Sequence, residues 1–359
     1  MTDSKQAPLD AEAAAKAAFA SVQDQPFPND IFTAPELRWA VIGCGVIANQ
    51  MAQSLALAGR KLAGVANRTL SKAQAFAEQY GVEKVYETVE DLYADPDIDA
   101  VYITTPHNTH ITYLRAALAA GKHVLCEKAI TLNSAELDEA RTIADEHNVV
   151  LMDATTVLHM PLYRELRRRM DAGEFGRMNL AQLNFGSYKE YGDLTNRFYN
   201  RSLAGGAMLD IGVYALSVMR LFMASQPVEV VSLGNTCETG VDVAGGIVCR
   251  NAEQQLGVVS LTLHSKQPKR SVISFDKCYI EVNEYPRADH ATIVWTADGR
   301  REEVHTGTEA YALCYEMADL EKAVAGDDSK RELLDYASDV MELMTKLRAD
   351  WGVVYPEEE

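Results

Sequence analysis

The twelve residues from Leu37 to Ala48 constrain the fold of this chain more than any other stretch. A short apolar run there ends in the turn Gly43-Cys44-Gly45, and a helical pattern begins immediately afterwards. A buried parallel strand passes into a helix in this way where the helix N-terminus faces a bound pyrophosphate. We expect Gly43 to allow the tight turn and Gly45 to leave room for a phosphate group.

The same pattern has a simpler explanation, because a Gly-x-Gly-x-x-Ala turn can join any strand to any helix. The context favours a dinucleotide site, since a second apolar run, Leu62–Ala66, follows after one helix length. A strand–helix–strand unit requires that spacing. The main-chain N–H groups of Val46 and Ile47, at the start of the helix, then face the phosphates.

Strand-like and helical segments alternate between residues 37 and 155. This alternation predicts an α/β Rossmann domain with a doubly wound parallel sheet and right-handed crossovers. The further strands are expected at Ala100–Thr104, His123–Cys126 and Val149–Met152, and the helices at Ser71–Tyr80, Thr109–Ala120 and Ser134–His147.

Residues 156–359 are predicted to form an α+β domain with a mostly antiparallel open sheet, for the substrate and for oligomerisation, because most of their segments are strand-like. The expected strands are Leu180–Phe185, Val228–Leu233, Gly246–Arg250, Leu256–Leu263, Ser271–Phe275, Cys278–Val282 and Ala291–Thr296. The expected helices are Leu162–Asp171, Gly206–Met223, Tyr311–Ala325 and Lys330–Ala349.

Residues 1–36 precede the first predicted strand. Their alanine-rich part, Asp10–Asp24, predicts a helix that ends before Pro26. This region is either an arm that packs on a neighbouring subunit or an N-terminal tail.

The charge of the chain argues against two classes of partner. A formal net charge of −18 over 359 residues disfavours binding to nucleic acid and to an anionic membrane surface. The sequence contains no apolar run that we expect to span a bilayer. The six cysteines are scattered without a Cys-x-x-Cys pair, which argues against disulfides and against a zinc cluster. We therefore expect a cytoplasmic protein without a metal.

The end of the second predicted strand bears on the choice of cofactor. NAD enzymes usually carry an acidic side chain there for the ribose 2′-hydroxyl group, but this chain has Asn67 and Arg68. Arg68 can pair with a 2′-phosphate, with Asn67 as a hydrogen-bond donor. The alternative is a solvated arginine in a surface loop. The residues favour NADP(H), with NAD(H) still possible.

Three separated motifs resemble the Gfo/Idh/MocA family of oxidoreductases. They are Thr105-Pro106-His107-Asn108-Thr109-His110, then Glu127-Lys128 and finally Gly205-Gly206-Ala207-Met208-Leu209-Asp210-Ile211-Gly212-Val213-Tyr214. The resemblance runs from about residue 37 to residue 347 and implies an NAD(P)-dependent dehydrogenase. It also implies that Thr105, Pro106, His107, His110, Glu127 and Lys128 lie at the cofactor.

The resemblance also implies the catalytic residues Lys128, Asp210 and Tyr214. Tyr214 stands where many members have histidine, as in the branch of dihydrodiol dehydrogenase, xylose dehydrogenase and glucose–fructose oxidoreductase. Ala129 replaces the family's proline after the lysine. The segment 154–161 differs from that branch, which leaves the substrate open.

The residue types fit oxidation of an alcohol, which requires a base for the hydroxyl proton. A phenol has an ordinary pKa of about 10, and a nearby ammonium group such as that of Lys128 would stabilise its anion. Asp210 and Tyr214 are four residues apart and so share one helix face. Without the resemblance, Asp210 could be a helix cap and Tyr214 a core residue.

Three further residues are candidates for contact with the substrate: His159, Tyr163 and Arg197. Together these observations predict an oxidoreductase that interconverts a hydroxyl and a carbonyl group on a sugar, polyol or diol. The alternative is a dinucleotide-sensing regulator without turnover. We also expect a homodimer or higher homo-oligomer, formed through the open sheet of the second domain.

Overall fold

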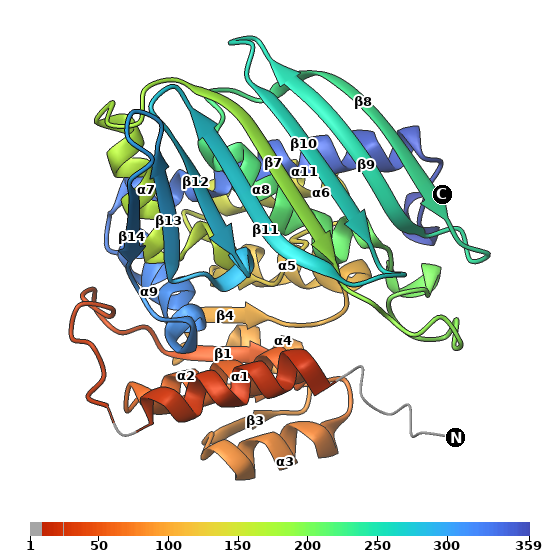
Figure 1. The fold of residues 1–359 in the computed structure, drawn as a ribbon. Helices are drawn as coiled ribbons and strands as arrows, with labels where there is room; N and C mark the ends of the chain where they lie inside the picture. Colours follow the sequence, from red (N-terminus) through yellow and green to blue (C-terminus); the bar gives the residue numbers. More distant parts are fainter. Residues whose placement is uncertain (1–8, 24) are drawn as a thin grey trace, which may run out of the picture. The chain divides into compact units, whose positions relative to one another are not determined.

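The computed structural model describes residues 9–23 and 25–359, and the chain forms two compact units (Figure 1). Unit 1 consists of the chain up to Thr131, together with Ala135–Ala154 and Ala310–Asp335. Unit 2 consists of Leu132–Ser134, Thr155–Glu309 and Tyr336–Glu359. Each unit is described below by itself.

Unit 1 contains a six-stranded parallel sheet with the strand order β3-β2-β1-β4-β5-β6. The strands are β1 (Trp39–Ile42), β2 (Gly64–Ala66), β3 (Lys84–Tyr86), β4 (Ala100–Ile103), β5 (His123–Cys126) and β6 (Leu151–Asp153). The order reverses between β1 and β4, which makes the sheet doubly wound as predicted. Ligands of such sheets bind at the carboxyl ends of the strands, at this reversal.

The helices of unit 1 are α1 (Leu9–Val22), α2 (Val46–Leu57), α3 (Leu70–Tyr80), α4 (Val89–Ala94), α5 (His110–Ala119), α6 (Ser134–Glu146), α9 (Ala312–Val324) and α10 (Asp328–Arg331). The predicted helices of unit 1 agree closely with the structure, except that the structure divides the helix predicted at Lys330–Ala349 into α10 and α11 (Leu333–Asp350). The sequence patterns did not reveal β3 and α4, because both elements are too short for a clear hydrophobic period.

Helix α9 belongs to unit 1, although the sequence assigned its residues to the second domain. Its side chains Leu313, Met317 and Leu320 are buried in the same core as β1 and α2. The carboxylate of Glu321 is fully buried and accepts a hydrogen bond from Trp39 Nε1 at 3.1 Å. It also pairs with Arg60 at 3.0 Å. The apolar side chains therefore place α9 in the core of unit 1, and Trp39 and Arg60 satisfy its buried carboxylate.

The residues before β1 are partly integrated into unit 1. The ring of Phe27 lies 5.9 Å from that of Phe32 and 5.0 Å from that of Tyr311. Ile31 is buried, and the guanidinium of Arg60 stacks on the ring of Phe32. This part therefore packs on its own chain rather than forming a tail. Residues 1–8 and 24 of the predicted arm lie outside the described residues.

Unit 2 contains an eight-stranded sheet with the order β14-β13-β12-β11-β7-β10-β9-β8. The strands are β7 (Met178–Gly186), β8 (Pro227–Thr236), β9 (Asp242–Asn251), β10 (Leu256–Thr262), β11 (Gln267–Phe275), β12 (Cys278–Asn283), β13 (His290–Trp295) and β14 (Arg301–His305). Only β7 and β10 pair in parallel, so the sheet is mostly antiparallel, as predicted. The charged strand β14 was not predicted.

The helices of unit 2 are α7 (Pro161–Asp171), α8 (Val213–Phe222) and α11 (Leu333–Asp350), the last of which begins in unit 1. Helix α8 contacts β7, β10 and β11 on one face of the sheet (Figure 1). On the same unit, the indole of Trp351 covers Gly234 and Gly245, where any side chain would overlap its ring.

One stretch departs from the expectation that no segment could span a membrane. By length and hydropathy, 201–222 would suffice, but 83% of its most apolar window is buried inside the protein. The core helix of a globular domain has the same properties, so this stretch is weak evidence for a membrane span.

Candidate active site

The turn after β1 has the geometry that a phosphate site requires. Gly43 has a φ of +103°, and a Cβ atom there would lie 2.6 Å from the Oγ1 atom of Thr104, so a larger residue does not fit. A Cβ atom on Gly45 would meet nothing within 4 Å. Val46, the first residue of α2, is 64% exposed, and Ile47 beside it is half-buried. The helix N-terminus is thus open to an anion.

Two cationic side chains follow β2. Arg68 is exposed directly after the strand, and Asn67 donates a hydrogen bond to the carbonyl oxygen of Thr69 at 3.0 Å. Lys72, in the first turn of α3, is also exposed. Burial raises the pKa of the Cys44 thiol to about 11, and the charge of Lys72 opposes that rise. Sequence reasoning overlooked Lys72, although it follows Arg68 by one helical turn.

The residues after β4 hold the backbone after β5. His107 Nε2 lies 3.0 Å from the carbonyl oxygen of Lys128. His110 is fully buried, with Nδ1 3.0 Å from the carbonyl oxygen of Ala129 and Nε2 2.8 Å from that of Thr105. Burial lowers the pKa of His110, while its hydrogen bonds to the backbone carbonyl oxygens oppose that shift.

These histidines were predicted to lie at the cofactor, and the structure gives each a contact with the protein backbone. Pro106, directly before His107, is exposed, and Thr105 is linked to Thr109 through a hydroxyl–hydroxyl hydrogen bond of 2.9 Å. The loop after β4 therefore supports the segment that carries Lys128.

Glu127 and Lys128 follow β5 and are both half-buried. The hydroxyl of Tyr102, on β4, donates a hydrogen bond to the carboxylate of Glu127. The main-chain N–H of Lys128 donates to the same carboxylate at 3.3 Å. Because β1, β4 and β5 are neighbours in the sheet, the turn at Gly43 and this pair lie at the same edge. Tyr102 had no signal in the sequence, since it looks like any strand residue.

Unit 2 brings Asp210 and Arg197 together. Asp210 is 8% exposed, and its Oδ1 atom lies 3.5 Å from Nη2 of the exposed Arg197. The guanidinium of Arg197 also stacks on Phe198 at 4.1 Å. Tyr214 is half-buried, with its ring 6.1 Å from that of Phe185 on β7.

The predicted helix 206–223 contains an irregular first part. Residues Met208–Gly212 form a π-helical turn, and α8 continues from Val213. Such turns are frequent at functional sites. Asp210 lies in the π turn and Tyr214 in the first turn of α8, so the two residues are on one continuous helical segment.

Two of the predicted substrate residues lie in the interior of unit 2. Tyr163 is 1% exposed, and its hydroxyl donates a 2.7 Å hydrogen bond to the carbonyl oxygen of Tyr285. Burial raises the pKa of Tyr163 well above its usual value. His159 is likewise fully buried. Both residues therefore lie in the interior of unit 2, and their contact with the substrate stays a prediction.

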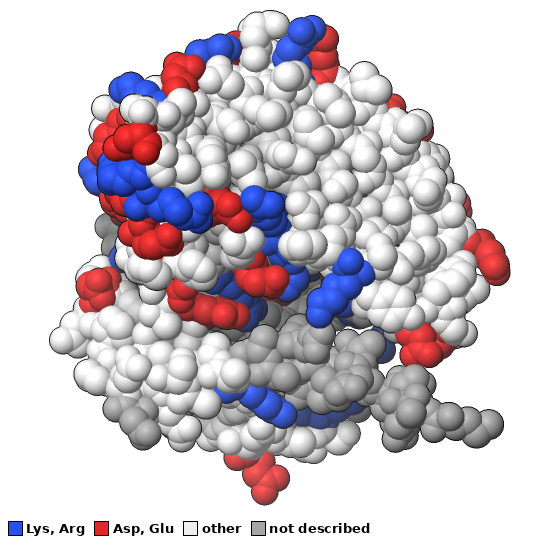
Figure 2. Space-filling model, in the orientation of Figure 1, with Lys and Arg blue, Asp and Glu red and all other residues white. Residues whose placement is uncertain are grey.

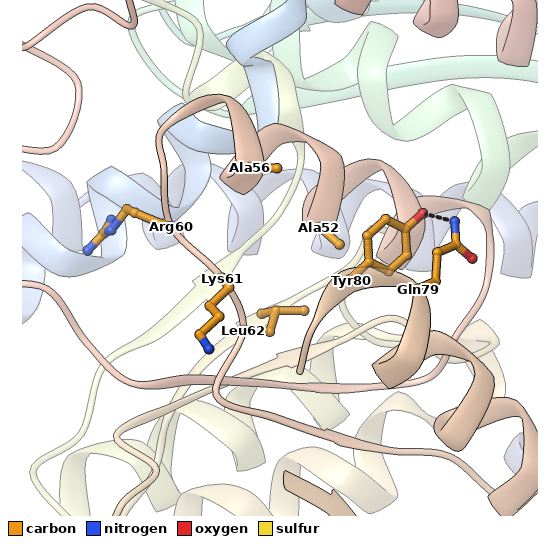
Figure 3. Close-up of a pocket in the computed structure, with 7 residues that line it drawn as sticks. All are labelled: Ala52, Ala56, Arg60, Lys61, Leu62, Gln79 and Tyr80. Carbon is orange, nitrogen blue, oxygen red and sulfur yellow. Dashed lines mark hydrogen bonds between the residues drawn. The ribbon is translucent and has the colours of Figure 1, made fainter. Parts of the chain in front are cut away.

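A small hollow in unit 1 involves none of the predicted site residues (Figure 3). It is lined by Ala52, Ala56, Arg60, Lys61, Leu62, Gln79 and Tyr80. Its two cations are engaged elsewhere, since Arg60 pairs with Glu36 and Glu321 and Lys61 pairs with Glu83. The hollow is therefore a gap between α2 and α3 rather than an anion site.

The part of the chain that the structure describes has no group of three or more His, Cys, Asp or Glu side chains placed to hold a metal ion. The six cysteines are free thiols.

Comparison with known proteins identifies the family. A family model for oxidoreductases with an NAD-binding Rossmann fold matches residues 37–155, and the model of the GFO/IDH/MocA C-terminal domain matches residues 163–281. Trans-1,2-dihydrobenzene-1,2-diol dehydrogenase from Mus musculus is 31% identical over 254 residues, which cover 69% of this chain and 75% of the relative. The enzyme of the same name from Xenopus laevis is 27% identical over 332 residues, which cover 89% of this chain and 99% of the relative.

Solved structures show the same fold. A 3-ketoreductase from Actinomadura kijaniata, in complex with NADP and TDP-benzene, superimposes with a TM-score of 0.75 at 25% identity and covers 88% of this chain and 98% of its own. Levoglucosan dehydrogenase, in complex with NADH and levoglucosan, gives a TM-score of 0.76 at 21% identity and covers 87% of this chain and 97% of its own. The glycine turn, the lysine after β5 and these matches lead to one conclusion: the chain belongs to the Gfo/Idh/MocA family of oxidoreductases.

Proposed function

We propose that this protein is an NADP-preferring dehydrogenase or reductase that acts on a hydroxyl or carbonyl group of a sugar, polyol or diol. The observation that carries the proposal is the open Gly43–Gly45 turn, at the same sheet edge as Lys128. The names of the relatives support the substrate class, since they are diol dehydrogenases.

The preference for NADP rests on two exposed cations after β2, in a stretch, 67–72, whose sequence contains no Asp or Glu. Arg68 can bind a 2′-phosphate through two parallel hydrogen bonds, and Lys72, exposed in the first turn of α3, adds a second positive charge after β2. A carboxylate in this place would repel the phosphate and favour NAD. The bound NADP in the 3-ketoreductase structure is consistent with this preference.

The remaining chemistry belongs to three side chains. The bound nicotinamide cofactor supplies the hydride acceptor or donor. In our proposal Tyr214 takes the proton from the substrate hydroxyl, and the ammonium of Lys128 stabilises the resulting phenolate. Asp210, held near Arg197, binds a second hydroxyl or orients the reacting one. Positioned acid–base catalysis contributes about a hundred- to ten-thousand-fold in rate.

The test is a screen of aldoses, polyols, inositols and trans-diols with NAD and NADP, followed by absorbance at about 340 nm. Turnover with any of these compounds supports the proposal. Tyr214→Phe and Lys128→Ala should then each lower kcat by about 100-fold or more while the protein stays folded. Binding of NADP without turnover of any compound would instead favour a dinucleotide-sensing regulator.

We also propose that the protein is a homo-oligomer and that the open face of the unit 2 sheet forms the interface between its subunits. Val231 and Leu233 on β8 are 75% and 83% exposed, and Val248 on β9 lies beside Val231 in the strand register. Figure 2 shows this face almost free of charged residues over β8, β9 and β10. Exposed apolar surfaces of this kind are typical of interfaces between protein chains. Light scattering should show that Leu233→Glu dissociates the oligomer and that His290→Glu, on β13, does not; a monomeric wild type would contradict the proposal.

A further inference from the structure

The residue that starts β9, Asp242, reaches the first turn of the helical segment that carries Asp210 and Tyr214. Asp242 is completely buried, and its Oδ2 atom accepts a 2.6 Å hydrogen bond from the main-chain N–H of Met208. Met208 is the first residue of the π turn. The first N–H groups of a helix have no partner within the helix, so this carboxylate supplies one.

The backbone beside Asp242 is shaped around the carboxylate. Gly206 has a φ of +124°, and a Cβ atom there would lie 2.3 Å from the Oδ1 atom of Asp242. The N–H of Gly206 donates to the carbonyl oxygen of Phe198 at 3.0 Å, and the N–H of Gly205 donates to that of Asn200 at 3.0 Å. The glycine pair therefore allows a charged side chain to approach the helix start closely.

The C-terminal segment holds the same turn from another direction. Tyr355 is fully buried, and its hydroxyl donates a 2.6 Å hydrogen bond to the carbonyl oxygen of Gly205. The guanidinium of Arg348, on α11, lies 4.7 Å from the Tyr355 ring and is paired with Glu358 at 2.8 Å. The groups that face Asp242 are thus Arg348 and Tyr355, together with the N–H groups of the helix start.

These groups also affect the ionisation of Asp242. Burial raises the pKa of its carboxyl group, while the N–H groups of Met208 and Ala207 and the charge of Arg348 oppose that rise, and the net result is a pKa of about 6. The carboxylate is therefore mostly charged at neutral pH, where it interacts favourably with the positive end of the helix dipole.

We propose that Asp242 and Tyr355 are positioning residues that fix the start of the helical segment presenting Asp210 and Tyr214. The inference rests on the proposed function, because it assigns the two residues an effect on that reaction. Neither residue needs to touch the substrate. A displacement of catalytic groups by about 1 Å can cost about 100-fold in rate, so the anchoring of this turn controls the efficiency of the site.

The experiment compares Asp242→Ala, Asp242→Asn and Tyr355→Phe with the control Asp276→Asn. Asp276 is an exposed aspartate that also accepts a hydrogen bond from a backbone N–H, that of Arg177 at 3.0 Å. Asn at position 242 retains an oxygen that can accept the hydrogen bond of Met208. All variants are assayed well below their melting temperatures, with kcat, KM, the pH profile of kcat and the Kd for NADP measured separately.

We expect Asp242→Ala to lower kcat about 10- to 100-fold and to shift the kinetic pKa of the general base, while the Kd for NADP stays within about twofold. Asp242→Asn should recover most of kcat, and Tyr355→Phe should lower it by several-fold. A purely structural role would lower the melting temperature but leave kcat and its pH profile unchanged. That result would overturn the proposal. If Asp242→Ala does not fold, the kcat and pH profile of Tyr355→Phe decide between the two roles.

Hydrogen exchange of the peptide 205–214 separates this proposal from the proposed function. In Asp242→Ala this peptide should exchange at least about tenfold faster than in the wild type, whereas Asp276→Asn should not change it. This measurement needs no substrate. Wild-type protein without turnover would refute the proposed function alone, and unchanged exchange in Asp242→Ala and Tyr355→Phe would refute the anchoring of the helix.

Discussion

The Nε2 atom of His107 lies 3.0 Å from the main-chain carbonyl oxygen of Lys128, so a residue after β4 supports the backbone that carries the lysine after β5. His110 makes the equivalent contact with Ala129. The loop between β4 and α5 therefore acts on the orientation of Lys128 through the main chain, whatever contact it makes with a bound cofactor.

Replacing His107 with leucine should lower kcat by about tenfold, because the Lys128 carbonyl loses its partner and the ammonium is less well placed. The Kd for NADP should change less than kcat. His290→Leu, at the exposed first position of β13, is the matched control. Wild-type turnover in His107→Leu would show that this contact does not position the lysine.

The two glycines of the phosphate turn should respond differently to alanine. Gly43→Ala should lower the stability by about 1–3 kcal/mol, because it combines a φ of +103° with a clash against Thr104. Gly45→Ala should leave the melting temperature unchanged, since its surroundings are open. It should weaken NADP binding by blocking the approach of the phosphate. Thermal unfolding measures the loss of stability, and titration of NADP measures the loss of binding. Equal losses of stability in the two variants would contradict the different roles of Gly43 and Gly45.

Reversing the charge at either cation after β2 should change cofactor preference. Arg68→Glu and Lys72→Glu should each raise the Kd for NADP by about 10- to 100-fold and leave the Kd for NAD nearly unchanged, because only NADP carries the 2′-phosphate. Lys61→Glu, which lies before β2 and pairs with Glu83, serves as the control. Equal effects on both cofactors would place the cations away from the ribose.

The buried carboxyl of Asp242 should make stability depend on pH. Its pKa is raised to about 6 in the folded protein by burial, above the usual value near 3.8, so the folded state binds more protons between these values. Stability from this group is therefore largest at low pH and is lost as the pH rises through this interval, by up to about 1.4 kcal/mol per pH unit.

Urea unfolding at several pH values should detect this dependence. The free energy of unfolding of the wild type, relative to Asp242→Asn, should decrease between about pH 4 and pH 6 and level off above that range. Arg348 and Tyr355, which face the carboxyl, stay in one charge state throughout this interval. A constant difference between the two proteins would show that Asp242 does not titrate there.

Local sequence patterns were sufficient to predict the elements that line the carboxyl edge of the parallel sheet. The turn at Gly43 and Gly45, the cation at Arg68 and the pair Glu127-Lys128 each follow a short apolar strand, and the strand period alone places them at strand ends. The irregular π turn at Met208–Gly212 was not visible, because its residues also fit an ordinary helix.

The sequence by itself determined that the chain alternates strands and helices around a glycine turn and then changes to an antiparallel sheet, because hydrophobic periods and turn residues act over a few neighbours. Only the tertiary structure decided that α9 joins the core of unit 1 and buries Glu321, that Tyr163 is interior, and that Asp242 meets Met208. These outcomes depend on burial and on contacts between residues far apart in the chain, and no local pattern encodes which distant partner satisfies a buried polar group.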